Sequence, residues 1–192
     1  MPKIIDHDAR RRELVEASWN VIAKEGLEGL TMRKIAAAAN CTTGRITHYF
    51  ANREALVLAS LQSAYDASAV RLNAIIAADL EPLEKLRRAV EETLPLDQQR
   101  LNEWRVWIAY WTAATTDPSL AQQNDTNHDR WLEAMMPLVQ DVAPTSNARH
   151  ETYLLLGLID GLGLRAAVNP TKENTNAART ALRDYLDQLS AQ

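Results

Sequence analysis

Apolar residues recur every three or four positions along almost the whole chain, and no segment shows the strict alternation of polar and apolar residues that marks an amphipathic strand. Glycine and proline are scarce, with six and seven in 192 residues, so little interrupts this periodicity. Pro82 and Pro118 stand where a helix is expected to begin, and Asn169-Pro170 stands where one is expected to end. The pattern predicts an all-α fold.

Start and stop signals divide the chain into a series of helices. Thr31, Thr42 and Asp97 are expected N-caps, because their side-chain oxygens can accept hydrogen bonds from the unpaired N–H groups of a first turn. A long helix is expected from Asn52 or Arg53 to Ile76, with a length of about 35 Å. The first four expected helices cover residues 10–25, 32–39, 42–50 and 53–76. Three more are expected to begin near residues 82, 97 and 118, and another after Pro144. The last expected helix includes residues 178–189.

Charge and cysteine content limit the classes of protein. Residues 1–56 carry nine Lys and Arg against seven Asp and Glu (9 − 7 = +2), and the remainder carries 12 against 18 (12 − 18 = −6). A basic head on an acidic body suits a chain that presents its head to a polyanion, and chance is the alternative. Cys41 is the only cysteine, so an internal disulfide is excluded. No apolar run could span a bilayer and no signal-peptide pattern opens the chain, so we expect a soluble cytoplasmic protein.

The segment from Thr31 to Leu56 carries the strongest functional signal. It reads as a short helix, a tight turn at Asn40 and Cys41, and a second short helix capped by Thr42. Such a unit can place its second helix in the major groove of DNA, which is just wide enough for one α-helix. The N-terminus of the second helix would offer backbone N–H groups to a phosphate. We therefore predict a DNA-binding helix-turn-helix.

The same segment closely resembles the signature of the TetR family of bacterial regulators. The matches, in unbroken register, are Thr31, Ile35, Ala36, Ala39, Gly44, Ile46, Tyr49, Phe50, Glu54 and Leu56. Four positions depart from the family pattern: Asn40 replaces a glycine, Cys41 a valine, Arg53 a lysine, and Thr47 a tyrosine that touches the DNA backbone. Asn40 is tolerable in a turn because asparagine adopts a left-handed conformation more readily than most residues.

The resemblance implies a set of DNA-contacting residues. Arg45 is the expected base reader, because a guanidinium can pair with guanine through two hydrogen bonds. Phosphate contacts, which position the protein without reading sequence, are expected from Thr31, Arg33, Tyr49 and Arg53. The full predicted DNA surface is Thr31, Arg33, Thr42, Thr43, Gly44, Arg45, Thr47, His48, Tyr49 and Arg53. A core position is the alternative for Tyr49, and Cys41 is interpreted as a small buried hydrophobe rather than a redox sensor.

An aromatic cluster marks the second half of the chain. Three tryptophans and a tyrosine fall within eight residues, 104–111, and their apolar arc is wider than contact with one neighbouring helix requires. Indole rings suit flat apolar ligands or cations, although a bulky core is the alternative. The predicted ligand pocket consists of Trp104, Trp107, Ile108, Tyr110, Trp111, Trp131 and Met135. The polar run at 124–129 is either a solvated face or loop, or the polar end of this pocket.

Glycines within a leucine-rich helix indicate close packing. Gly157 and Gly161 share one helical face and would let another helix approach closely, and the helix around Leu158–Leu162 resembles the BetI-like branch of the TetR family. That resemblance implies a four-helix interface in a homodimer. The predicted interface residues are Leu154, Gly157, Leu158, Gly161, Leu182, Tyr185 and Leu189. We predict an N-terminal three-helix DNA-binding domain at 1–52 and a C-terminal helical bundle at 53–192 for ligand binding and dimerisation.

These features together predict a ligand-responsive transcriptional regulator. The expected partners are double-stranded DNA with a palindromic operator, a small-molecule effector that releases it, and a second copy of the chain. The sequence contains no nucleophile elbow, phosphate loop or paired metal-binding histidines, so it predicts neither catalysis nor a metal or cofactor. An activator or a co-regulator that works through a protein partner is the alternative to a repressor.

Overall fold

The computed structural model describes residues 7–144 and 147–191, so the first six residues of the predicted DNA-binding domain lie outside the described part. The predicted all-α fold is confirmed, because every regular element in the described part is a helix. The elements are α1 (His7–Glu25), α2 (Met32–Ala38), α3 (Thr43–Tyr49), α4 (Arg53–Ile76), α5 (Pro82–Thr93), α6 (Gln98–Ala114), α7 (Pro118–Val142), α8 (Ala148–Val168) and α9 (Lys172–Leu189).

The helix boundaries follow local capping. The side chains of Thr31, Thr42 and Asp97 each accept a hydrogen bond from a backbone N–H in the first turn of α2, α3 and α6, as their positions predicted. Asn52 caps α4 and Asp117 caps α7 in the same way. Each cap satisfies one of the N–H groups that a helix start leaves without an intrahelical partner.

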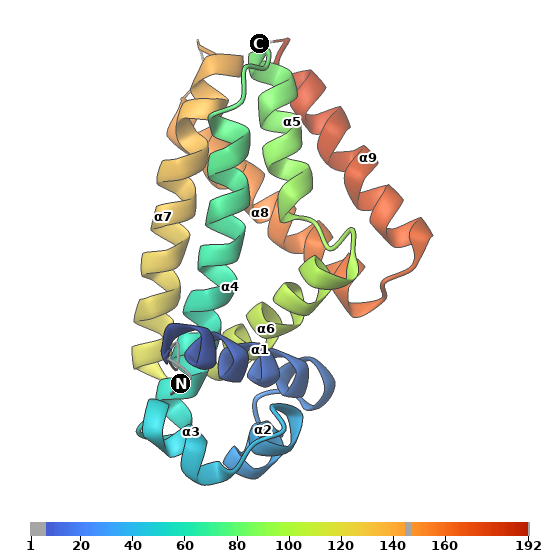
Figure 1. Ribbon diagram of the computed structural model, residues 1–192. Helices are drawn as coiled ribbons and strands as arrows, with labels where there is room; N and C mark the ends of the chain where they lie inside the picture. The colour runs from blue at the N-terminus through green and yellow to red at the C-terminus, as the bar shows by residue number, and fades with distance from the viewer. Residues whose placement is uncertain (1–6, 145–146, 192) are drawn as a thin grey trace.

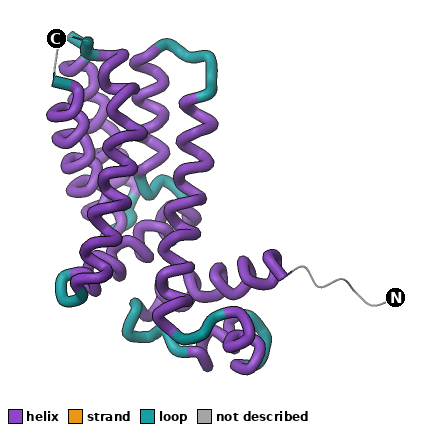
Figure 2. The backbone as a smooth tube through the Cα atoms, turned by 90° about the vertical axis from the view of Figure 1, so that its left-hand side faces the viewer, coloured by secondary structure: helices purple, strands orange, loops and turns teal. Residues whose placement is uncertain are grey.

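The helices form a small head and a larger body. In Figure 1, α1, α2 and α3 lie together at one end, and α4 rises from them and packs against α5. Figure 2, turned by 90°, shows the same division, with the short helices below the long ones. One core fills the head, and α4 contributes Leu56, Val57, Ala59 and Ala64 to it. A second core fills the body and includes Leu72 of α4, so the division between the two cores falls inside this helix.

Helix α6 lies where head and body meet. It packs against α1 and α4 on one side and against α7 and α8 on others. Val106 of α6 belongs to the head core and is 3% exposed, and Trp107 packs against the same core. The wide apolar arc of this helix is therefore covered by neighbours on several sides, as its sequence predicted. None of the described helices is long and apolar enough to cross a membrane.

Candidate DNA-binding surface and ligand cavity

Helix α3 presents a polar face to solvent. Thr43, Gly44, Arg45, Thr47 and His48 are exposed, whereas Ile46 is fully buried in the head core. The buried isoleucine fixes which face of α3 turns inward, and the five exposed residues form the part of α3 that faces solvent. Thr31, Arg33 and Thr42 are exposed as well. The head therefore offers one continuous polar helix end, as the helix-turn-helix prediction requires.

The turn between α2 and α3 depends on Asn40. This residue has a φ of 47°, in the left-handed region where asparagine is tolerated, as the sequence predicted. At Gly44, an added Cβ would meet only the Thr42 hydroxyl, at 3.9 Å. Packing inside the protomer therefore does not require a glycine there.

Arg53 makes contacts inside the head. Its Nε donates to the carbonyl oxygen of Leu30 at 2.8 Å, and a second guanidinium nitrogen donates to the carbonyl of Leu27. The side chain thus joins the start of α4 to the loop between α1 and α2. Arg53 therefore helps to hold the head together, and its phosphate contact stays a prediction.

Three other residues in or beside α3 lie against the core. Tyr49 is half-buried and packs on the head core, while its ring also lies 5.1 Å from that of His48. Phe50 is 3% exposed, with the guanidinium of Arg11 over its ring. Cys41 is half-buried against the same core, which fits its interpretation as a small hydrophobe. Tyr49 combines a core contact with an accessible edge, so its phosphate contact stays a prediction.

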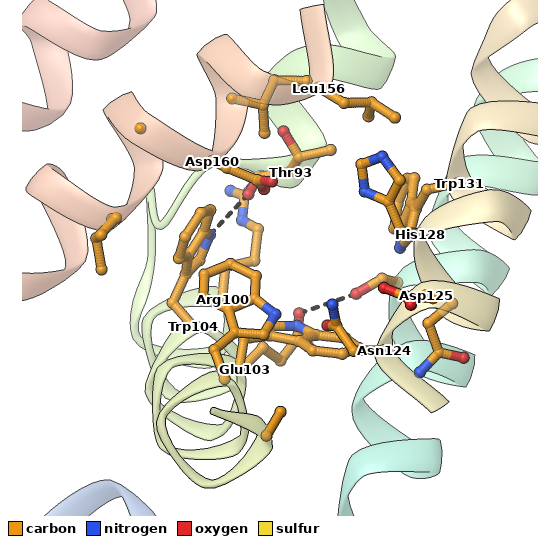
Figure 3. A pocket seen from close by; sticks show the side chains of 18 of the residues that line it. Thr93, Arg100, Glu103, Trp104, Asn124, Asp125, His128, Trp131, Leu156 and Asp160 are labelled. Atoms are coloured by element: carbon orange, nitrogen blue, oxygen red, sulfur yellow. Dashed lines mark hydrogen bonds between the residues drawn. The ribbon is translucent and has the colours of Figure 1, made fainter. Parts of the chain in front are cut away.

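A cavity of about 610 Å³ opens in the body between α4, α5, α6, α7 and α8. Four tryptophans line it, as predicted: Trp104, Trp107, Trp111 and Trp131. Figure 3 shows Trp104 on one side of the cavity and Trp131 with His128 on the opposite side. Trp104 and Trp111 stand edge to face, with ring centroids 5.9 Å apart. The cavity size lies within the usual range for small-molecule sites.

Trp104 is fixed by two contacts. Its Nε1–H donates to the carbonyl oxygen of Thr93 at 2.7 Å, and the side chain is 6% exposed. On its other side it lies against Gly163 of α8, where an added Cβ would come within 2.1 Å of the indole ring. The close approach of this ring therefore requires a glycine at 163.

Three residues predicted for the pocket do not line it. Tyr110 is 1% exposed and its hydroxyl donates to the carbonyl of Leu120 at 2.6 Å, and burial, with the nearby Asp117, raises the pKa of Tyr110 to about 12. Met135 is fully buried in the body core, and Ile108 packs against the Leu101–Trp104 cluster. The apolar arc of α6 is wide enough to fill both a cavity wall and a core, so Tyr110 and Ile108 lie on its core side, whereas Met135 belongs to the core through α7.

The polar run at 124–129 is a continuous part of α7 and lines the cavity. Asn124, Asp125, Asn127 and His128 all face it, so this run forms the polar end of the pocket rather than a loop. Asp160 of α8 completes this end. Its side chain is accessible from the cavity, yet burial raises the pKa of Asp160, and the nearby His128 offsets part of that shift.

A network of charged residues at the cavity wall was missed by the sequence analysis. Glu103 is 3% exposed and accepts two hydrogen bonds from Arg71, at 3.0 and 2.6 Å. Arg71 also pairs with Glu92, which in turn accepts from Arg100 at 3.3 Å. Burial lowers the pKa of Arg71, but its hydrogen bonds to Glu103 and Glu92 outweigh that effect, and the net shift is upward. Arg71 is 32 residues from Glu103, so no local pattern could have joined them.

The outer face of α8 is apolar and exposed. Tyr153, Leu154, Leu158, Leu164 and Val168 are between 38% and 70% exposed. Gly157 and Gly161 lie among them, and a Cβ added at either would meet nothing within 4 Å. This surface includes four of the predicted interface residues.

The predicted interface residues on α9 need correction. Leu182 and Leu189 are each 1% exposed, inside the core of the protomer itself. Tyr185 is half-buried and its hydroxyl donates to Glu151 at 3.0 Å. The apolar stripe of α9 therefore covers its own bundle, and Leu182 and Leu189 are not available to a second copy in this conformation, whereas the interface role of Tyr185 stays a prediction. Within the described residues, no group of three or more His, Cys, Asp or Glu could hold a metal ion.

An exposed helix-turn-helix on an all-α body with an internal cavity defines a DNA-binding transcriptional regulator. Residues 14–60 match the profile of the tetR family of bacterial regulatory proteins, and residues 82–191 match that of the C-terminal domain of BetI-type transcriptional repressors. The chain belongs to the TetR family, with a BetI-type C-terminal domain.

Similar proteins agree with this assignment. The chain is 31% identical over 193 residues to the transcriptional regulator BetI of Paraburkholderia phymatum, and the match covers 100% of this chain and 98% of that protein. It is 28% identical to the regulator PksA of Bacillus subtilis, across 98% of this chain and 94% of that one. These relatives are regulators and not enzymes.

Solved structures show the same fold. A transcriptional regulator from Rhodococcus sp. Rha1 superimposes with a TM-score of 0.84 at 27% identity, over 93% of this chain and 95% of that chain. A putative regulator from Saccharomonospora viridis, crystallised in complex with choline, superimposes with a TM-score of 0.86 at 24% identity, over 94% of this chain and 97% of that chain.

Proposed function

We propose that this TetR-family regulator is a repressor that binds a palindromic operator as a homodimer and is released by a small organic cation. The observation that carries the proposal is the composition of the cavity. Four indole rings line it, and its charged wall contains four acidic side chains (Glu92, Glu103, Asp125 and Asp160) against one basic side chain, Arg100. Indole faces and carboxylates both attract a cation, and they disfavour an anion.

The cation is expected to be small and alkylated. A quaternary or tertiary ammonium has apolar methyl groups that fit against indole faces, whereas a strongly hydrated ion would lose its water there. The Saccharomonospora relative binds choline, which supports this class of ligand. Asp160 and Glu103 are the proposed counter-charges: Asp160 lies near His128, and Glu103 shares the cavity wall although Arg71 also binds its carboxylate.

The dimer is proposed to form through the outer face of α8. Leu154 and Leu158 supply exposed apolar surface, and Gly157 and Gly161 leave room for the backbone of a second helix. A face of large apolar side chains at 38–70% exposure is unusual on a free helix and typical of an interface. A two-fold axis beside α8 would place two copies of α3 for successive major grooves, which are roughly 34 Å apart.

Selection from a random duplex library tests DNA recognition. Purified protein is incubated with the library and the bound pool is sequenced, and we expect a two-fold symmetric consensus. With that duplex, Arg45→Ala should cost about 1–3 kcal/mol at one base pair, whereas Arg33→Ala should weaken all sequences alike and reduce the salt dependence. Equal losses on every sequence for both variants would show that Arg45 does not read a base.

Tryptophan fluorescence tests the ligand class. Choline chloride is titrated against its neutral isostere, 3,3-dimethylbutan-1-ol, at constant ionic strength. We expect the cation to change the fluorescence of the cavity tryptophans and to lower operator affinity, and the neutral analogue to do neither. An equal response to both compounds would contradict selection for charge.

A further inference from the structure

Glu103 joins the cavity wall to the helix that enters the DNA-binding head. Its carboxylate accepts hydrogen bonds from Arg71 of α4 at 3.0 and 2.6 Å. The hydroxyl of Ser68, also on α4, lies 3.4 Å from the same carboxylate and shares its one proton between Glu103 and the carbonyl of Ala64, which is 3.1 Å away. Gln99 of its own helix donates to it at 3.3 Å. Ser68 and Arg71 are one helical turn apart, so this one carboxylate fixes both the position and the rotation of α4 against α6.

The same helix is rigidly part of the head. The residues of α4 up to Ala64 pack in the head core, and Trp19 of α1 donates from its indole Nε1 to the carbonyl of Ser60 at 2.9 Å. A change at Ser68 or Arg71 therefore acts close to the point where α4 leaves that core. At the same time Ser68 and Glu103 line the cavity, where a bound molecule can reach them.

We infer that Glu103 is the positioning residue through which occupancy of the cavity reaches the DNA-binding head, because a bound cation and Arg71 compete for its carboxylate. This inference rests on the proposed function, since it concerns the regulation of the same cavity. A buried carboxylate that simply lost Arg71 would be strongly destabilised. A cation in the cavity supplies the missing charge, so the bond to Arg71 can loosen without leaving Glu103 unpaired.

Charge balance favours this exchange. Arg71 and Arg100 face Glu92, Glu103 and Asp97, which gives a net charge of 2 − 3 = −1. One added monocation neutralises the network, and Arg71 retains Glu92 as a partner when it shares or releases Glu103. An anion or a neutral molecule offers no such replacement and should leave α4 fixed.

The test removes the charge of Glu103 without changing its shape. Glu103→Gln keeps the size and helix propensity of the side chain, and Arg71→Lys keeps the charge but loses the planar fork that holds two oxygens. Glu84→Gln is the matched control, because it breaks an exposed Glu–Arg pair on α5 at 2.8 Å, away from the cavity. Hydrogen–deuterium exchange of α4 in the free protein and operator affinity are measured for each.

We expect Glu103→Gln and Arg71→Lys to speed exchange in α4 beyond Ala64 and to raise the operator Kd about 10-fold, a usual strength of coupling between sites. A loosened α4 lets the two heads sample more positions, and that freedom is lost on binding. Choline chloride should produce the same two changes in the wild type, relative to potassium chloride, and little further change in Glu103→Gln. The control should match the wild type.

Each outcome tests one part of the inference. If hydrogen–deuterium exchange in α4 and the operator Kd are unchanged in both variants, Glu103 does not position α4 and the inference is wrong. If wild-type protein responds equally to choline and potassium, competition by a cation is wrong. A wild type that enriches no duplex refutes the proposed function, whereas exchange in α4, measured without DNA, still decides the role of Glu103.

Discussion

Gly163→Ala should deform the wall of the cavity, because the glycine is in direct contact with Trp104. A Cβ built at 163 would lie 2.1 Å from one indole carbon and 2.4 Å from another, whereas ordinary contacts begin at 3.4 Å. The ring must therefore retreat by 3.4 − 2.1 = 1.3 Å. It cannot do so freely, since its Nε1–H is bonded to the Thr93 carbonyl and the side chain is 6% exposed.

The expected loss of stability follows from three contributions. Overpacking a core of this kind costs about 1–3 kcal/mol, and weakening the hydrogen bond to Thr93 adds about 1 kcal/mol. Alanine is favoured over glycine inside a helix by about 1 kcal/mol, which acts in the opposite direction. The free energy of unfolding should therefore fall by about 1–3 kcal/mol, which corresponds to about 2–12 °C in Tm for a chain of this length.

Thermal and denaturant unfolding, followed by tryptophan fluorescence, measure this effect. Gly157→Ala is the control on the same helix, because nothing lies within 4 Å of its added Cβ inside the protomer. Any loss in the control should depend on protein concentration, since Gly157 faces the proposed dimer partner, whereas the loss in Gly163→Ala should not. A Gly163→Ala protein as stable as the wild type, with unchanged fluorescence, would refute the reasoning.

Two further predictions concern the cavity and the dimer. Burial raises the pKa of Asp160, so the native fold holds that proton more tightly than the unfolded chain does, and stability is lost as pH rises through the shifted pKa. Asp160→Asn should therefore unfold at a higher temperature than the wild type at neutral pH, but not below pH 3.8, the ordinary pKa of an aspartate. The variant should also bind choline more weakly. A variant that is less stable than the wild type at neutral pH would contradict this prediction. Leu158→Glu, at a position 38% exposed in the protomer, should leave the helix content intact but yield monomers in sedimentation and lose operator binding; a stable dimer would place the interface elsewhere.

Sequence reasoning succeeded where neighbours along the chain decide the structure. The caps at Thr31, Thr42 and Asp97 depend on N–H groups three residues away, and the left-handed Asn40 depends on its own side chain. The helix-turn-helix of the head was predicted for the same reason. Each of these features depends on residues within a single helical turn, so periodicity and residue type were enough to predict it.

It failed where the partner lies far away in the sequence. The stripe of Leu182 and Leu189 correctly indicated an apolar face on α9, but periodicity does not tell whether the chain itself or a second copy covers that face. Tyr110 and Met135 were apolar enough for a cavity and are instead buried in the core. The polar run at 124–129 could not be assigned to the cavity from the sequence, because Asp160, which lines the same cavity, lies far away in the chain on α8.

The position of α6 explains how a small ligand could act over a short distance. Trp107 lines the cavity and also packs against the head core, and Glu103, one turn earlier, holds α4. The floor of the cavity is therefore made by side chains that contact the DNA-binding domain directly. Because packed cores shift between discrete arrangements rather than deforming smoothly, a displacement of α6 must move α1 or α4, or break their contacts with it. Regulation in this protein then needs no long relay of residues, since a single helix forms both the wall of the cavity and part of the head core.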